Sequence, residues 1–137
     1  MGKRQLLALD VGEKRIGVAL ADSSIGISIA FETIEVNGSE LERIARIVVD
    51  EKIDTIVVGY PRNQSGEATK QTAYVETFAT QLVDMDAEVV FQDESLTSVR
   101  AEEILDRQKR PYAKGDIDAL AASLILQDYI EENRGRI

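Results

Sequence analysis

Three carboxylates stand at positions from which they could act together. Asp10 interrupts the apolar run at residues 6–11, Glu94 follows the run at 88–92, and Asp118 lies among small and apolar residues. An Asp in a buried strand is costly unless a partner or a metal ion neutralises it. Three converging acids repel one another, and a divalent cation removes that repulsion. Two such cations about 4 Å apart can align a water molecule and stabilise the leaving oxygen in phosphodiester cleavage.

Each of these acids also has an ordinary structural explanation. Asp10 could cap the turn at Gly12, and Glu94 could be an exposed acid in a loop. Asp118 could complement the dipole in the first turn of a helix. The hypothesis of an active site therefore depends on the three positions taken together.

The residue types that are absent narrow the chemistry further. The chain of 137 residues has no Cys and no His. Disulfides, thiol nucleophiles, Ser-His-Asp catalysis and metal sites built from Cys or His are therefore excluded. Any acid–base or metal chemistry must depend on carboxylates, Lys, Tyr or hydroxyl groups. Carboxylate oxygens favour hard cations, so the expected cofactor is Mg²⁺ or Mn²⁺.

Length and charge set the scale of the molecule. The length predicts a single domain over residues 1–137. The chain has 16 basic and 25 acidic residues and a net charge of −9, which argues against broad non-specific binding to nucleic acid. A local basic rim beside an acidic centre is still compatible with that total. No signal-peptide pattern and no apolar stretch of about 20 residues is found, so we expect a cytoplasmic protein without a membrane partner.

The elements that must position the acids follow from the hydrophobic pattern. The order β-β-β-α-β-α-β-α-α predicts the α/β class, with a five-stranded mixed sheet and helices on its faces. In such sheets, functional sites form beyond the carboxyl ends of the parallel strands. The strands are predicted at residues 6–11, 16–21, 27–36, 55–59 and 88–92, and the last three helices at 67–84, 96–108 and 116–131.

Several local features are predicted as well. Ser39 and Glu42 have the spacing of a capping box at the start of the first helix. The third strand should contain a break near Ala30, and residues 60–66 should form a loop. The helical periodicity places Val83 and Val99 on the buried sides of their helices.

The ordered motifs of the chain resemble the YqgF family of RNase H-like proteins, also described as Holliday junction resolvase-like or pre-16S rRNA nuclease proteins. The resemblance covers nearly the whole chain. The residues that carry it are Leu9-Asp10-Val11-Gly12, Lys14 to Ala19, Val57-Val58-Gly59-Tyr60-Pro61 with Gly66, Asp93 to Ser98 with Ala101, and Ile117 to Ala122.

This resemblance implies a single RNase H-like nuclease domain with a metal-dependent site. Asp10, Glu94 and Asp118 match the acidic triad of the family, as catalytic residues and as metal ligands. The family's usual Asp-Glu-Arg motif reads Asp93-Glu94-Ser95 here, so a cation next to the site is missing. Asp116 is a spare acid, either as a fourth ligand or as the cap of the last helix.

Positive and polar residues near these motifs are candidates for nucleic-acid binding. Lys14, Arg15 or Arg62 could supply the cation that Ser95 does not, and Thr97 could bind a phosphate at a helix N-terminus. In the loop at 109–115, Tyr112 could stack on a base. An N-cap and a solvated loop are the structural alternatives. The full set of candidate contacts is Lys14, Arg15, Arg62, Thr97, Arg110, Tyr112 and Lys114.

Four functions remain open at this point. The first is a divalent-metal-dependent nuclease that acts on structured RNA, in processing the 5′ end of pre-16S rRNA during ribosome biogenesis. The second is the same hydrolysis on branched DNA, as a Holliday junction resolvase, which would favour a homodimer over a monomer. The third is a non-catalytic nucleic-acid-binding module. The fourth is an ATP-binding domain of the actin type, which normally needs two such domains, whereas this chain supplies one.

Overall fold

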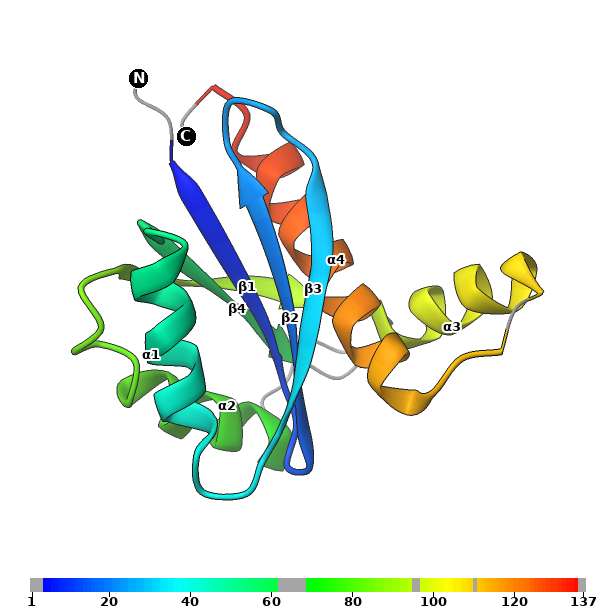
Figure 1. Ribbon diagram of the computed structural model, residues 1–137, viewed down its shortest axis with the longest axis horizontal. Helices are drawn as coiled ribbons and strands as arrows, with labels where there is room; N and C mark the ends of the chain where they lie inside the picture. The colour runs from blue at the N-terminus through cyan, green and yellow to red at the C-terminus, as the bar shows by residue number, and fades with distance from the viewer. Residues whose placement is uncertain (1–3, 62–68, 95–96, 110, 136–137) are drawn as a thin grey trace.

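The computed structural model describes residues 4–61, 69–94, 97–109 and 111–135, with only the backbone of Thr97 and Ser98. Its elements follow the predicted order β-β-β-α-β-α-β-α-α (Figure 1). The strands are β1 (Gln5–Val11), β2 (Arg15–Asp22), β3 (Ser28–Glu35), β4 (Thr55–Pro61) and β5 (Glu88–Glu94). The helices are α1 (Glu40–Asp50), α2 (Lys70–Thr80), α3 (Thr97–Gln108) and α4 (Lys114–Glu132).

The strands form one mixed sheet, which confirms the predicted α/β class. Its order is β3-β2-β1-β4-β5 over five strands. The pairs β1/β2 and β2/β3 are antiparallel, and the pairs β1/β4 and β4/β5 are parallel. The carboxyl ends of β1, β4 and β5 therefore meet at one edge of the sheet, which is where a site is expected. A register shift interrupts β3 between the partners of Val18 and Ala19, close to the predicted break at Ala30.

Side chains from the two faces of the sheet form two cores. On β1, Leu7, Leu9 and Val11 belong to the larger core, which α1 and α2 cover. Leu6 and Ala8 face the other way and pack against α4. Because side chains alternate along a strand, Asp10 lies on the α4 face with Leu6 and Ala8. Figure 1 shows α1 and α2 on one side of the sheet, with α3 projecting away from it.

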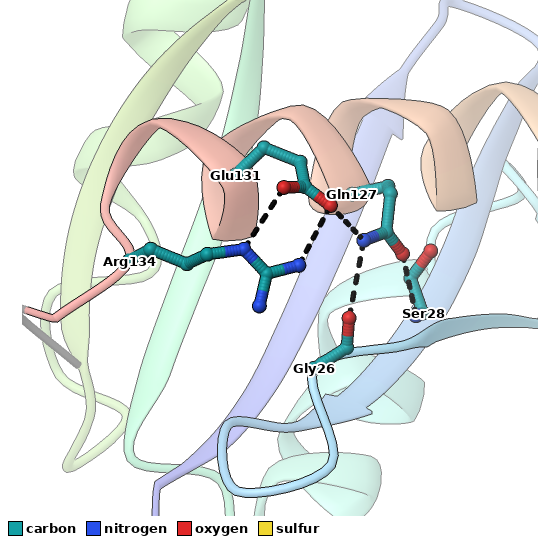
Figure 2. A network of polar contacts seen from close by, with 5 residues as sticks. All are labelled: Gly26, Ser28, Gln127, Glu131 and Arg134. Carbon is teal, nitrogen blue, oxygen red and sulfur yellow. Dashed lines mark hydrogen bonds and ion pairs between the residues drawn. The ribbon is translucent and has the colours of Figure 1, made fainter.

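Helix α4 is fastened along β3 by bonds between side chains and backbone. Thr33 Oγ1 donates to the Gly115 carbonyl at 2.5 Å, and Ser28 Oγ donates to the Ser123 carbonyl at 2.6 Å. Further along, the Gln127 amide accepts from Ser28 N at 3.0 Å and donates to the Gly26 carbonyl at 3.1 Å (Figure 2). Glu131 links Gln127 to Arg134 in the same network. These bonds hold the helix, and with it Asp118, at a defined position over the sheet.

Three local predictions for the first two helices and the fourth strand are wrong. Ser39 makes no side-chain cap bond, because its backbone (φ −111°, ψ 5°) is not in the extended conformation of a usual N-cap. Glu40 instead accepts from the backbone of Gly38 at 2.7 Å. Helix α2 is shorter than predicted, because the Thr69–Thr72 capping box starts it and turns replace helix beyond Thr80. Strand β4 continues through Tyr60 and Pro61, the first residues of the predicted loop.

The inward positions assigned to two valines are also wrong. Val83 lies in the turn after α2 and is 64% exposed, whereas Leu82 beside it is fully buried. Val99 is 48% exposed, because α3 packs on α4 and extends away from the sheet, so that it buries Ala101 instead. In the described part of the chain, no helix combines the length and the apolar character that a membrane span requires.

Candidate active site

Asp10 and Glu94 come together across the strand that lies between them. Asp10 is near the carboxyl end of β1 and Glu94 is the last residue of β5, with β4 between these strands. Gly59 of β4 has no side chain to separate them: a Cβ there would lie 2.2 Å from Glu94 Oε2. The Glu94 side chain therefore passes over Gly59 and shares a hydrogen bond with the carboxyl group of Asp10. The neighbouring Asp93 points to the opposite face, because side chains alternate along β5.

This acid pair holds a proton at neutral pH. Burial, together with the negative charges of Glu94 and Asp118, raises the pKa of Asp10 from 3.8 to about 8, and burial is the largest cause. Burial also raises the pKa of Glu94, although the hydrogen bond from Asp10 lowers it in part. Two carboxylates this close cannot both ionise without a cation, so one proton is retained between them. The pair is therefore a position where positive charge is electrostatically favoured.

Asp118 is placed beside this pair by the close approach of α4 to β2. Gly17 of β2 is the partner of Asp10 in the antiparallel ladder. A Cβ at Gly17 would lie only 1.9 Å from the backbone oxygen of Asp118. The role of Gly17 is therefore to permit tight helix–sheet packing. Because α4 begins at Lys114, Asp118 lies at its fifth residue, beyond the predicted first turn.

In this structure the side chain of Asp118 is bound to Arg15. Arg15 Nε donates to Asp118 Oδ2 at 2.7 Å, with side-chain exposures of 30% and 22%. The hydrogen bond and the charge of Asp118 raise the pKa of the Arg15 guanidinium. Within the described ranges, no group of three or more His, Cys, Asp or Glu side chains is arranged to hold a metal ion. The three predicted acids are therefore neighbours, but two share a proton and the third faces a guanidinium.

The chemistry of these side chains suits a divalent cation. The three residues offer only carboxylate oxygens, which are the ligands that Mg²⁺ and Mn²⁺ prefer. The proton between Asp10 and Glu94 and the guanidinium on Asp118 mark where a cation would relieve repulsion. Asp116 is not part of this group. Its carboxylate accepts from Ala113 N at 2.9 Å and so caps α4. Of the two predicted alternatives, the capping role is therefore the one observed.

The predicted nucleic-acid contacts are distributed around this edge of the molecule. Arg15 lies in the site itself, and the exposed Lys14 precedes it in the turn after β1. Lys114 is exposed at the first residue of α4. The Tyr112 hydroxyl donates to Asp106 of α3 at 2.5 Å. This hydrogen bond is the main cause that raises the pKa of Tyr112 to about 12. Arg62, Arg110 and the side chain of Thr97 lie outside the described residues.

Two features of the site were not predicted from the sequence. The first is Gly59, whose signal was visible as a glycine inside an apolar strand, a position that often marks close approach of another group. The second is the Arg15–Asp118 ion pair, which joins residues 103 positions apart. No local pattern contains information on that pairing.

Comparisons with known proteins place the chain in a well-populated group. The family model RuvX, described as Holliday junction resolvase, matches residues 4–132. A protein from Chloroflexus aurantiacus named "Putative pre-16S rRNA nuclease" is 40% identical, over 98% of this chain and 91% of its own length. A protein of the same name from Bacillus subtilis is 38% identical, over 93% of this chain and 97% of its own.

Solved structures share the fold at low sequence identity. One is Thermus thermophilus RuvC in complex with Holliday junction substrate, with a TM-score of 0.60 and 14% identity over 97% of both chains. Another is the Fowlpox virus resolvase in complex with Holliday junction DNA, with a TM-score of 0.59 and 14% identity over 95% of this chain and 99% of the other. These similarities confirm an RNase H-like fold.

Proposed function

The chain belongs to the RuvX (YqgF) family, and on that premise we propose that it is a divalent-metal-dependent nuclease that hydrolyses phosphodiester bonds. The observation that supports this most strongly is the acid pair of Asp10 and Glu94 over Gly59, with Asp118 beside it. This arrangement lies at the carboxyl ends of the parallel strands, where substrates reach such sheets.

Asp10, Glu94 and Asp118 would hold Mg²⁺ or Mn²⁺ as the catalytic residues of this site. A bound divalent cation supplies activation of a water molecule and stabilisation of the leaving oxygen. The protein's own part is to present the three carboxylates from elements held by the sheet and by α4. Binding of a cation requires the Asp10–Glu94 pair to release its proton, because only the ionised oxygens are good ligands.

The proposed substrate is structured RNA, in the processing of the 5′ end of pre-16S rRNA, as the names of the relatives suggest. A substrate of that kind places the expected activity in the cytoplasm, in ribosome biogenesis. The second candidate is branched DNA, which the description of the family model favours. A homodimer would suit that substrate, since two sites are needed to resolve a junction symmetrically.

Cleavage assays with both substrates test the proposal. Labelled structured RNA and a four-way DNA junction would be incubated with wild type and with Asp118→Asn, each with Mg²⁺, with Mn²⁺ and with EDTA. We expect metal-dependent cleavage that falls by at least about 100-fold in the variant, as for loss of a residue that stabilises the transition state. The preferred substrate decides between RNA processing and junction resolution.

Arg43→Gln serves as the control for that assay. Arg43 pairs with Glu32 on α1 and β3, away from the acidic residues, so its loss should leave cleavage unchanged. Absence of cleavage by correctly folded wild type, with either substrate and either metal, would favour a non-catalytic nucleic-acid-binding module.

A further inference from the structure

The ion pair between Arg15 and Asp118 lies at the centre of the proposed site. Arg15 is the first residue of β2, and its Nε donates to Asp118 Oδ2 at 2.7 Å. Both side chains are partly exposed, at 30% and 22%, so solvent ions reach the pair. A contact of this kind is weak enough to be exchanged for another partner, because exposed ion pairs are worth little net free energy.

The backbone of Asp118 is fixed, whereas its side chain has two neighbouring groups, Arg15 and Asp10. The peptide of Asp118 rests on Gly17, which leaves no room even for a Cβ. Arg15 lies two residues before Gly17 on the same face of β2, and Asp10 is the partner of Gly17 on β1. Because the Asp118 backbone is held in this way, an exchange of its carboxylate between Arg15 and Asp10 would take place by rotation of the side chain rather than by a shift of α4.

We propose that Arg15 is a positioning residue that holds the Asp118 carboxylate away from Asp10 and Glu94 until a divalent cation competes for it. This inference rests on the metal-dependent site proposed above. Without a cation, the Arg15 guanidinium neutralises Asp118. A divalent cation brings enough charge to replace Arg15 on Asp118, after which the three carboxylates can converge on it.

Exchange of this kind would link metal binding to substrate binding. Once Asp118 turns to the cation, the guanidinium of Arg15 is free beside the site. A planar guanidinium with several N–H donors is well suited to a phosphate group. Metal and nucleic acid should then each increase the affinity for the other, because linkage is reciprocal.

Metal affinity is the first test. Isothermal titration calorimetry with Mg²⁺ and with Mn²⁺ would compare wild type, Arg15→Gln, Arg15→Lys and Lys14→Gln, each shown to be folded by circular dichroism. Removing the competitor should make Arg15→Gln bind the cation about threefold more tightly, as expected for loss of a partly exposed ion pair. Arg15→Lys should lie between Arg15→Gln and wild type. Lys14→Gln controls for the loss of a positive charge nearby, since Lys14 is exposed in the adjacent turn.

Nucleic-acid affinity is the second test. Fluorescence anisotropy with structured RNA and with a four-way junction would be measured in EDTA and in Ca²⁺, which is used here to occupy the site without rapid cleavage. Arg15→Gln should bind as wild type does in EDTA, where Arg15 is held by Asp118. In Ca²⁺ the variant should bind about threefold more weakly and lose about one unit of salt slope, as for one phosphate contact.

The outcomes separate this inference from the proposed function. If wild type binds neither Mg²⁺ nor Mn²⁺, the proposed metal site fails and the inference fails with it. If wild type binds the cation but Arg15→Gln binds it no more tightly than wild type, the inference alone is overturned. The same holds if Arg15→Gln binds the cation only as tightly as Lys14→Gln does. A loss of nucleic-acid affinity that is the same in EDTA and in Ca²⁺ would likewise overturn the exchange.

Discussion

Asp10 is the residue at which stability and proposed function oppose each other most directly. On the α4 face of the sheet its neighbour on β1 is the fully buried Ala8, and an ionised carboxylate beside this apolar core loses solvation. The structure compensates for this through the proton shared with Glu94. Such a buried acid is retained at a cost in stability, which is common at functional sites.

The raised pKa of Asp10 gives a pH dependence of defined sign. Its pKa is about 8 in the folded protein and near 3.8 in the unfolded chain, so the folded state binds this proton more tightly. The stabilisation is complete below about pH 4 and is lost as the pH rises through about 8. Asp10→Asn should therefore be more stable than wild type by about 1–3 kcal/mol at about pH 9, with little difference near pH 4.

Urea unfolding in EDTA across this pH range measures the effect. Asp84→Asn, in the turn after α2, is the control for the loss of one exposed negative charge. A gain in stability that does not change with pH, or a less stable Asp10→Asn at high pH, would show that Asp10 does not hold a proton in the folded state.

At the scale of elements, the contact of α4 with β2 determines where the third acid lies. The hydrogen bonds from Ser28 and Thr33 hold the helix along β3, and Gly17 permits its backbone to reach the sheet. Ala121 and Ala122, one turn after Asp118, are fully buried in the same contact. The small residues that follow Asp118 in the sequence thus allow α4 to lie close to the sheet.

Gly17→Ala tests this contact. Its Cβ would lie 1.9 Å from the Asp118 carbonyl oxygen and 2.3 Å from the carbonyl carbon, and these backbone atoms cannot rotate away. Helix α4 would have to lift, so we expect a loss of about 3–5 kcal/mol in the free energy of unfolding, together with loss of cleavage. Urea denaturation followed by circular dichroism measures the first effect.

Gly115→Ala is the matched control within α4. A Cβ there would lie 3.6 Å from atoms of Thr33, which is an ordinary contact. Because Ala favours a helix over Gly, this variant should be unchanged or up to about 1 kcal/mol more stable. If Gly17→Ala unfolds within about 1 kcal/mol of wild type, the packing account of Gly17 is wrong.

At the scale of the whole molecule, the net charge of −9 restricts how nucleic acid can be bound. Long-range repulsion opposes approach of any polyanion, so affinity must come from contacts near the site and from bound cations. The described cations at that edge include Arg15, Lys14 and Lys114. Binding should therefore be selective for substrates whose shape brings a phosphate into the site.

The net charge of the molecule predicts weak binding to plain duplex nucleic acid. We expect a Kd of about 100 µM or weaker for a linear duplex in EDTA at physiological salt, at the weak end of non-specific binding. Fluorescence anisotropy with a labelled duplex measures it, beside the four-way junction and structured RNA in Ca²⁺. A duplex Kd near 1 µM without divalent ions would contradict the proposed dominance of site contacts.

The sequence by itself determined the order of the elements, the mixed sheet and the three acids. Strand and helix periodicities are properties of the local chain, so a strand with Asp10 inside it and a helix with Asp118 near its start could be predicted directly. Because side chains alternate along β5, Glu94 rather than Asp93 lies on the same face of the sheet as Asp10. The capping box at Ser39 and the inward positions of Val83 and Val99 were wrong, because cap geometry and helix packing depend on more than spacing.

Only the tertiary structure decided how these acids meet. Three contacts join segments that are distant along the chain: Glu94 with Gly59, the backbone of α4 with Gly17, and Arg15 with Asp118. They depend on strand register and on how closely two backbones approach, and both are set by the packing of the whole sheet. Local patterns carry no record of such distances, so the protonated pair and its neighbouring ion pair could not be found without the fold.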